Sequence, residues 1–79
     1  MTVEVKLFAT LRRHFPDLGV GEAMTVDLPG NATLGQLLLT LDLPEEQVKV
    51  MFVNGIVRKP DYRLSDGDEV GVFPPIGGG

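Results

Sequence analysis

The sequence predicts a small α+β domain in which one helix covers one face of a sheet of about four or five strands. Three observations support this prediction. Short segments of alternating apolar residues occur at both ends of the chain. One leucine-rich segment has helical spacing, and an Asn-Gly pair separates two apolar runs. A chain of 79 residues can form one core but leaves little room for an enclosed active site.

The N-terminal part of the chain predicts two strands separated by a turn and a loop. Residues 2–8 alternate as a half-buried strand does. Its inward positions are Val3, Val5 and Leu7. Leu11 and Phe15 suit a short irregular or helical turn, and residues 16–21 form a loop by composition. Residues 22–28 alternate again and predict the second strand. Its apolar positions are Met24, Val26 and Leu28.

The helix is the clearest element of the sequence. Thr33 and Gln36 have the spacing of a capping box, in which each side chain bonds a free backbone N–H at the helix start. The following stripe of about three turns would face the core. Its members are Leu34, Leu37, Leu38 and Leu41. Residues 44–46 predict one further short turn that begins with proline.

A hairpin and a last strand complete the predicted sheet. Residues 48–53 form an apolar strand, and Asn54-Gly55 turns the chain into a short strand at residues 56–57. A connecting segment follows, and the residues available there for packing are Tyr62 and Leu64. Residues 66–68 predict a tight turn, and residues 69–73 the last strand, which could lie beside the first at the sheet centre.

Composition excludes several classes of function. The chain has no cysteine, so disulfides, thiolate metal sites and a cysteine nucleophile are excluded, and cytoplasmic residence fits. A net charge of −4 argues against a nucleic-acid partner. No apolar run approaches the ~18 residues that span a bilayer, and the N-terminus reads directly as a strand rather than a signal peptide. We therefore expect no nucleic acid and no membrane.

The folded part offers poor candidates for catalysis or metal binding. The single histidine, His14, follows two arginines in a predicted loop, where a solvated side chain is the expected state. The acidic run at residues 66–69 lacks the spacing of a calcium loop. We expect no metal site.

The C-terminal tail is the remaining candidate. We assign residues 1–73 to the domain and residues 74–79 to an extended tail. Its members are Pro74, Pro75, Ile76, Gly77, Gly78 and Gly79. The two prolines favour an extended path away from the sheet, and the four residues after them reach about 13–14 Å. Such a tail could thread a narrow channel and present the Gly79 carboxylate, which adenylation would make reactive. The simpler alternative is a frayed terminus without a role.

Several motifs resemble a known family. They are Leu64-Ser-Asp-Gly-Asp-Glu-Val70, Phe73-Pro-Pro75, Gly78-Gly79, Leu7-Phe-Ala-Thr-Leu-Arg12, Thr33-Leu-Gly-Gln-Leu-Leu38 and Val53-Asn-Gly55. Together these motifs span nearly the whole chain. In their order along the chain they are similar to the ubiquitin-like sulfur carriers of the MoaD/ThiS type. Within that family they look most like the small subunit of molybdopterin synthase.

The resemblance implies a β-grasp fold and a reaction sequence in which several partner proteins act on the C-terminus. An adenylyltransferase related to ubiquitin-activating enzymes would use ATP to join AMP to Gly79. A sulfur donor fed by a cysteine desulfurase would then leave a thiocarboxylate. The tail would enter the large subunit of molybdopterin synthase, which supplies the catalytic residues and makes the dithiolene of the molybdenum or tungsten cofactor. The chain itself would hold no permanent cofactor.

Three alternatives remain open at this point. The sulfur could go to thiamin or another thiolated product, although Phe73-Pro-Pro75 favours the molybdopterin branch. The chain could instead be a ubiquitin-like modifier joined to lysines through Gly79. It could also be a binding module whose tail is inert.

The strand at residues 48–53 predicts partner-binding residues, because it carries apolar side chains on both of its faces. One side must face the helix, and the other is either covered by loops or forms an exposed apolar patch of the kind that marks binding sites. We predict anchors at Met51 or Phe52, whichever points outward, and at Phe73. An acidic set at the last turn either steers docking onto a basic partner or is simply solvated. Its members are Asp66, Asp68 and Glu69.

Overall fold

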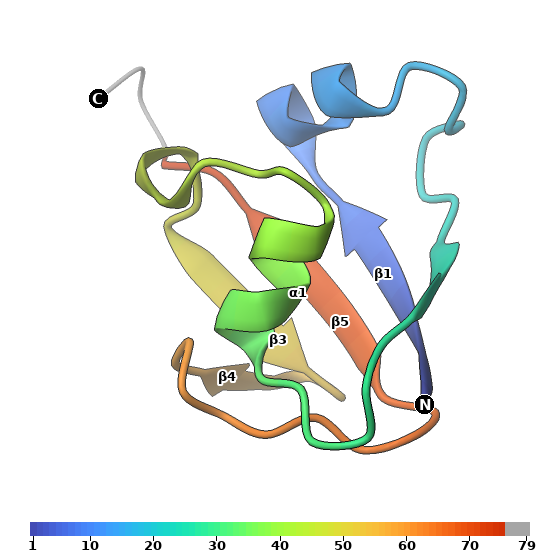
Figure 1. Cartoon of the computed structure of the whole chain (residues 1–79). Coiled ribbons are helices and arrows are strands. Elements are labelled where there is room, and N and C mark those ends of the chain that lie inside the picture. The colour runs from blue at the N-terminus through green and yellow to red at the C-terminus, as the bar shows by residue number, and fades with distance from the viewer. Residues whose placement is uncertain (76–79) are drawn as a thin grey trace.

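The computed structural model describes residues 1–75, which form a five-stranded mixed sheet with one α-helix packed on one face (Figure 1). The strands are β1 (Thr2–Leu7), β2 (Met24–Asp27), β3 (Val50–Val53), β4 (Ile56–Arg58) and β5 (Glu69–Phe73). The helices are the 3₁₀ turns η1 (Ala9–His14) and η2 (Glu45–Gln47) and the α-helix α1 (Leu34–Thr40). Over this part of the chain, no helix is long and apolar enough to cross a bilayer.

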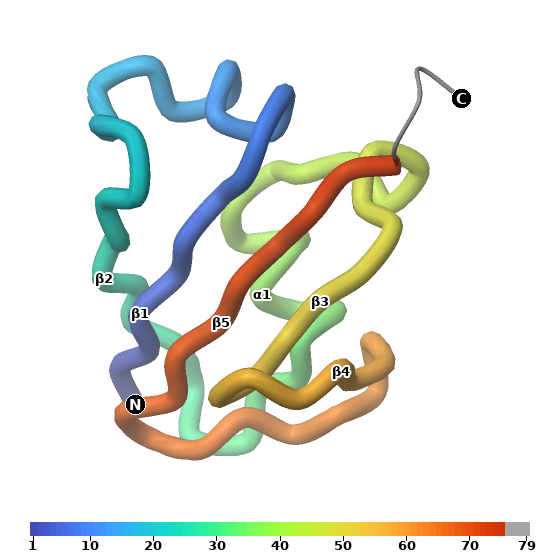
Figure 2. The backbone as a smooth tube through the Cα atoms, turned by 180° about the vertical axis from the view of Figure 1, so that it is seen from behind, coloured from blue at the N-terminus to red at the C-terminus, as the bar shows by residue number. Residues whose placement is uncertain are grey.

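The strand order is β2-β1-β5-β3-β4, so the first and last strands form the sheet centre as predicted. Figure 2 shows β1 and β5 running side by side, with α1 on the far side of the sheet. Their pairing is parallel, with Val5 opposite Val70 and Leu7 opposite Val72. The other neighbouring strands pair antiparallel. This mixed sheet with one helix is a β-grasp fold, which confirms the fold prediction.

The core lies between the sheet and α1. Alternation along the strands directs one residue in two toward the helix, and the predicted leucine stripe of α1 meets them. The core residues of the strands are Val3, Val5, Leu7, Val26, Met51, Val53, Val70 and Val72. Those of α1 are Leu34, Leu37 and Leu38. Among residues 1–75, no helix or strand covers the face of the sheet opposite α1 (Figure 2).

The start of α1 is tied to the loop before β5. The predicted capping box is present, because the Thr33 side chain accepts from the Gln36 backbone N–H and the Gln36 side chain accepts from that of Thr33. The next N–H groups donate to the same loop: Leu34 N to Tyr62 O at 3.0 Å and Gly35 N to Pro60 O at 2.9 Å. The helix N-terminus is therefore fully paired with protein groups.

The helix has seven residues rather than the predicted three turns. Asp42 adopts a left-handed conformation with φ of 56°. The Leu43 N–H then donates to Leu38 O, and the Asp42 N–H donates to Leu39 O. These bonds form a Schellman motif, which normally has glycine at the left-handed position. Because aspartate stands there, the sequence carries no clear stop signal and the predicted helix was too long.

Both predicted turns have the required backbone conformation. Asn54 and Gly55 have φ of 51° and 83°, which joins β3 to β4 in the predicted hairpin. Gly67 has φ of 85°. Two strands are shorter than predicted. The strand predicted at residues 22–28 is β2, Met24–Asp27, and the strand predicted at residues 48–53 is β3, Val50–Val53.

We expect Gly67→Val to destabilise the domain by at least about 1–2 kcal/mol, the cost of a left-handed conformation for an L-residue with a side chain. A Cβ at Gly67 would meet no atom within 4 Å, so the loss would come from the backbone alone. The Gly67 N–H also donates to Thr2 O at 2.7 Å. Urea unfolding measures the change. Gly67→Asn is the matched control and should lose less, because asparagine tolerates positive φ. Equal stability of the two variants would contradict this account.

Candidate functional site

The root of the tail is the end of β5, the central strand. Phe8 N donates to Val72 O at 3.1 Å on the β1 side, and Lys49 N donates to Phe73 O at 2.8 Å on the β3 side. Pro74 and Pro75 have no N–H and cannot continue either ladder. The chain is therefore fixed as far as Phe73 and leaves the sheet at one defined point.

The tail root and the N-terminus lie at opposite ends of the sheet (Figure 1). Of the predicted tail residues, Pro74 and Pro75 are half-buried. The remaining members, Ile76–Gly79, lie outside the described residues. Their predicted roles in channel insertion and in sulfur chemistry at Gly79 stay predictions.

Three phenylalanines gather at the tail root on the uncovered face of the sheet. The rings of Phe8 and Phe73 stack with centroids 4.1 Å apart and an interplanar angle of 4°. Phe52 meets Phe73 edge-on, with centroids 5.4 Å apart and an angle of 75°. All three are only half-buried. We call Phe8, Phe52 and Phe73 the aromatic cluster; exposed aromatic surface of this kind is typical of protein interfaces.

The cluster settles which of the two predicted anchors on β3 points outward. Phe52 belongs to the uncovered face, whereas Met51 is 4% exposed and packs in the core. Met51 is therefore not available to a partner. The partner-binding roles of Phe52 and Phe73 stay predictions.

Sequence reasoning missed Phe8 and Gly71. Phe8 ends the predicted strand at residues 2–8 and shares the outward parity of Glu4 and Lys6, so the alternation alone would have placed it on the exposed face. A glycine inside a strand marks a close approach of other groups. At Gly71 a Cβ would lie 3.4 Å from Phe8 Cε2 and 3.5 Å from Phe73 Cε1, so the two rings occupy the space over this glycine.

An open hollow of about 400 Å³ lies on the uncovered face beside these rings. We call it the Gly71 hollow. Its lining residues are Glu4, Lys6, Phe8, Phe52, Gly55, Glu69, Val70, Gly71 and Phe73. It thus joins the aromatic cluster at one end to charged side chains at the other.

The acidic set at the last turn divides into structural and exposed members. Asp68 is 7% exposed; its Oδ2 accepts from Ser65 N at 2.7 Å and its Oδ1 from Asn54 Nδ2 at 3.0 Å. The buried Asp68 carboxylate thus holds the turn to the β3–β4 hairpin, and a role of the acidic set in docking stays a prediction. Asp66 and Glu69 are exposed.

We expect Asp68→Ala to lower the free energy of unfolding by about 1–3 kcal/mol, because the Ser65 N–H and the Asn54 amide both lose their acceptor. The matched control is Asp66→Ala. Asp66 is exposed and accepts one bond, from Thr2 N at 2.7 Å, so about 0.5–1 kcal/mol is expected. Urea unfolding of both variants measures the difference, and similar losses would contradict the structural role of Asp68.

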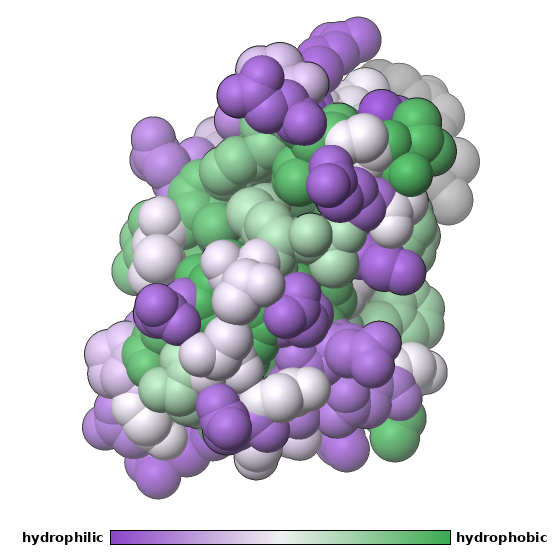
Figure 3. Space-filling view, turned by 90° about the vertical axis from the view of Figure 1, so that its right-hand side faces the viewer, coloured by the Kyte–Doolittle hydropathy of each residue, from purple (hydrophilic) through white to green (hydrophobic). Residues whose placement is uncertain are grey.

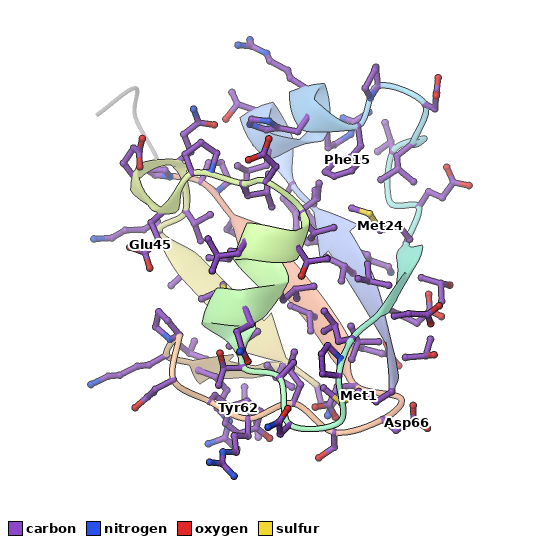
Figure 4. All side chains as sticks on the ribbon, viewed as in Figure 1. Met1, Phe15, Met24, Glu45, Tyr62 and Asp66 are labelled. Carbon is purple, nitrogen blue, oxygen red and sulfur yellow. The ribbon has the colours of Figure 1, made fainter. Side chains whose placement is uncertain are left out.

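Hydrophilic residues gather at the end of the domain away from the tail root. Figure 3 shows them dominating the lower part of the side formed by β1 and β2. Figure 4 places Asp66 and Met1 at the same end. On the side that Figure 3 shows, the end away from the tail root is thus predominantly hydrophilic.

A second recess lies beside the tail root between η1 and η2. It measures about 550 Å³ and includes Pro74 and Pro75 in its lining. His14 is exposed there, with Nε2 2.8 Å from Gln47 Oε1, which links the two 3₁₀ turns. In residues 1–75, no group of three or more potential ligand side chains is placed to hold a metal ion.

Comparisons with known proteins find one matching family and two kinds of similar protein. A model of the ThiS family matches residues 5–79. A putative molybdopterin converting factor, subunit 1, from Pyrococcus furiosus is similar over 96% of this chain and 99% of its own, with 31% identity and a TM-score of 0.77. SAMP1 from Haloferax volcanii, small archaeal modifier protein 1, is similar over 100% of both chains, with 26% identity and a TM-score of 0.77.

A further solved structure shares the fold at lower identity. It is a chain of the complex of subunits 1 and 2 of molybdopterin-converting factor from Helicobacter pylori 26695. The likeness covers 100% of both chains, with 24% identity and a TM-score of 0.64. Comparison with curated proteins gives no match.

Proposed function

The chain belongs to the ThiS family of ubiquitin-like sulfur carriers and modifiers, and on this basis we propose that it carries sulfur for molybdopterin synthesis. The sulfur would be held as a thiocarboxylate at Gly79. The observation that carries the proposal is the position of the tail, which leaves the central strand beside the exposed aromatic cluster. A partner that docks on this cluster receives the tail at a fixed distance from its binding surface.

The chemistry requires two steps at the Gly79 carboxylate. In the first, a carboxylate oxygen attacks the α-phosphorus of ATP, a P–O bond forms and pyrophosphate leaves. In the second, a sulfur nucleophile such as hydrosulfide attacks the acyl carbon, a C–S bond forms and AMP leaves. Both steps belong to partner enzymes: an adenylyltransferase, and a sulfur donor fed by a cysteine desulfurase. This chain supplies the reacting carboxylate and the surface that positions it.

The molybdopterin branch is favoured by two features. The relative from Pyrococcus furiosus, at 31% identity, is named as subunit 1 of a molybdopterin converting factor. The Phe73-Pro74-Pro75 run also joins the aromatic cluster directly to the tail. We therefore propose a large subunit as the second partner, which would take the sulfur from the tail.

Intact mass spectrometry tests the carrier function. The chain is incubated with its cognate adenylyltransferase, ATP and hydrosulfide, and with the same mixture lacking ATP. We expect a mass gain equal to the exchange of one oxygen for one sulfur, only where ATP is present. An unchanged mass with an enzyme shown to form the adenylate on another carrier would overturn the proposal.

A modifier function is the second candidate, because small archaeal modifier protein 1 is similar over the full length of this chain at 26% identity. It predicts heavier conjugates in cell extract that resist reductant and disappear when Gly79 is deleted. The carrier function alone predicts no such species.

A further inference from the structure

The Gly71 hollow has two chemically different ends. Outward residues of a strand follow one another at about 6.6 Å, so Glu69, Gly71 and Phe73 cover about 13 Å along β5. Glu69 marks the charged end and Phe73 the aromatic end, and the rings of Phe8 and Phe73 lie over Gly71 between them. An occupant of the hollow would thus meet an apolar surface at one end and a polar one at the other.

The charged end carries an unfavourable arrangement. Glu4 and Glu69 stand directly opposite each other in the parallel register of β1 and β5, both on the uncovered face. Like charges in this position destabilise a sheet. Thr25 Oγ1 donates to the two Glu4 oxygens at 3.0 and 3.2 Å, and Lys6 also lines the hollow. With two carboxylates and one ammonium, the lining keeps an excess of negative charge.

A cation placed between the carboxylates would relieve their repulsion, and an apolar stem would pack against the half-buried rings of the aromatic cluster. Arginine has both parts: its methylene stem packs on apolar surface, and its planar guanidinium binds carboxylates bidentately and stacks on aromatic rings. A leucine or phenylalanine would cover the aromatic end but remove water from the carboxylates without pairing them, which is unfavourable.

We propose that the Gly71 hollow receives an arginine side chain from the adenylyltransferase that activates the tail. This inference rests on the proposed carrier function. The aromatic cluster supplies the apolar contact around the arginine, and Glu4 with Glu69 selects a partner with a positive charge at the centre of its docking surface. The two glutamates are thereby specificity-determining residues for the activating partner.

The test measures KM and kcat for ATP-dependent thiocarboxylation by the cognate adenylyltransferase at low and high salt. The double variant Glu4→Gln/Glu69→Gln removes both charges and keeps the shape of the hollow. We expect its KM to rise about tenfold or more at low salt with kcat unchanged, and its KM to depend less on salt than that of the wild type. Thermal unfolding checks that the variant remains folded.

Two further variants separate charge from shape. Asp17→Asn/Asp61→Asn removes two charges from exposed loop residues, and its KM should stay within about twofold of the wild type. Gly71→Val places a side chain against the rings of Phe8 and Phe73 and displaces them, so it should raise KM as the glutamate variant does. A rise with Gly71→Val but none with Glu4→Gln/Glu69→Gln would mean an apolar occupant and would overturn the inference.

The outcomes for the function and for the inference are distinct. If the wild type is thiocarboxylated and the glutamate variant has the same KM, the arginine proposal is wrong and the carrier function stands. If the wild type is not thiocarboxylated by an active enzyme, the carrier function is wrong and the inference is overturned with it.

Discussion

Deletion of Gly79 is expected to abolish thiocarboxylation and to leave the thermal unfolding transition unchanged. Without this residue the terminal carboxylate stands about 3.3–3.6 Å short of its position in the partner's active site. A displacement of even about 1 Å can lower a rate by about 10²-fold. The core residues of the described part lie between Val3 and Val72, and a terminal glycine has no side chain to add to a core.

Intact mass and calorimetry measure the two expectations on the same sample. Gly77→Ala is the matched control, because it alters the tail while keeping its length and its terminal carboxylate. It should retain most of the activity. If the chain without Gly79 is thiocarboxylated as fast as the full chain, the position of the Gly79 carboxylate has no special role. That result would overturn the proposed carrier function.

Phe52→Asp is expected to weaken binding to the adenylyltransferase by about 30-fold or more, with little change in stability. An aromatic anchor at the centre of an interface contributes about 2 kcal/mol or more. Phe52 is half-buried on the uncovered face and contacts Phe73 at the tail root, so a charge there would be buried on docking. Isothermal calorimetry with the purified enzyme gives the affinity.

Leu39→Asp provides the matched control. Leu39 is 80% exposed on α1, the opposite side of the sheet from the aromatic cluster. The same change from apolar to acidic there should leave the affinity within about twofold. If both variants bind alike, the aromatic cluster is not the docking surface.

Local signals predicted most of the fold. The alternation of β1, the capping box of Thr33 and Gln36, and the Asn54-Gly55 hairpin each depend on residues close together in the chain, and each is confirmed. The end of α1 was not predicted, because a left-handed aspartate at position 42 carries a weaker stop signal than glycine.

The site was harder to predict because it depends on contacts across the sheet. The structural role of Asp68 was not predicted, because nothing local shows that Asn54 lies beside it and donates to its carboxylate. The stack of Phe8 on Phe73 joins the two ends of the chain and depends on the parallel pairing of β1 with β5. The role of Gly79 came from the family resemblance, because glycine alone does not distinguish a reactive terminus from an inert one.

The position of β5 also determines how the domain responds to mechanical force on its tail. A pull directed along β5 slides this strand between β1 and β3, so the hydrogen bonds of both ladders are loaded in shear and have to break together. An edge strand such as β4, paired on one side, would peel away one bond at a time. The domain is therefore more resistant to unfolding by a pull along β5 than by a pull on β4.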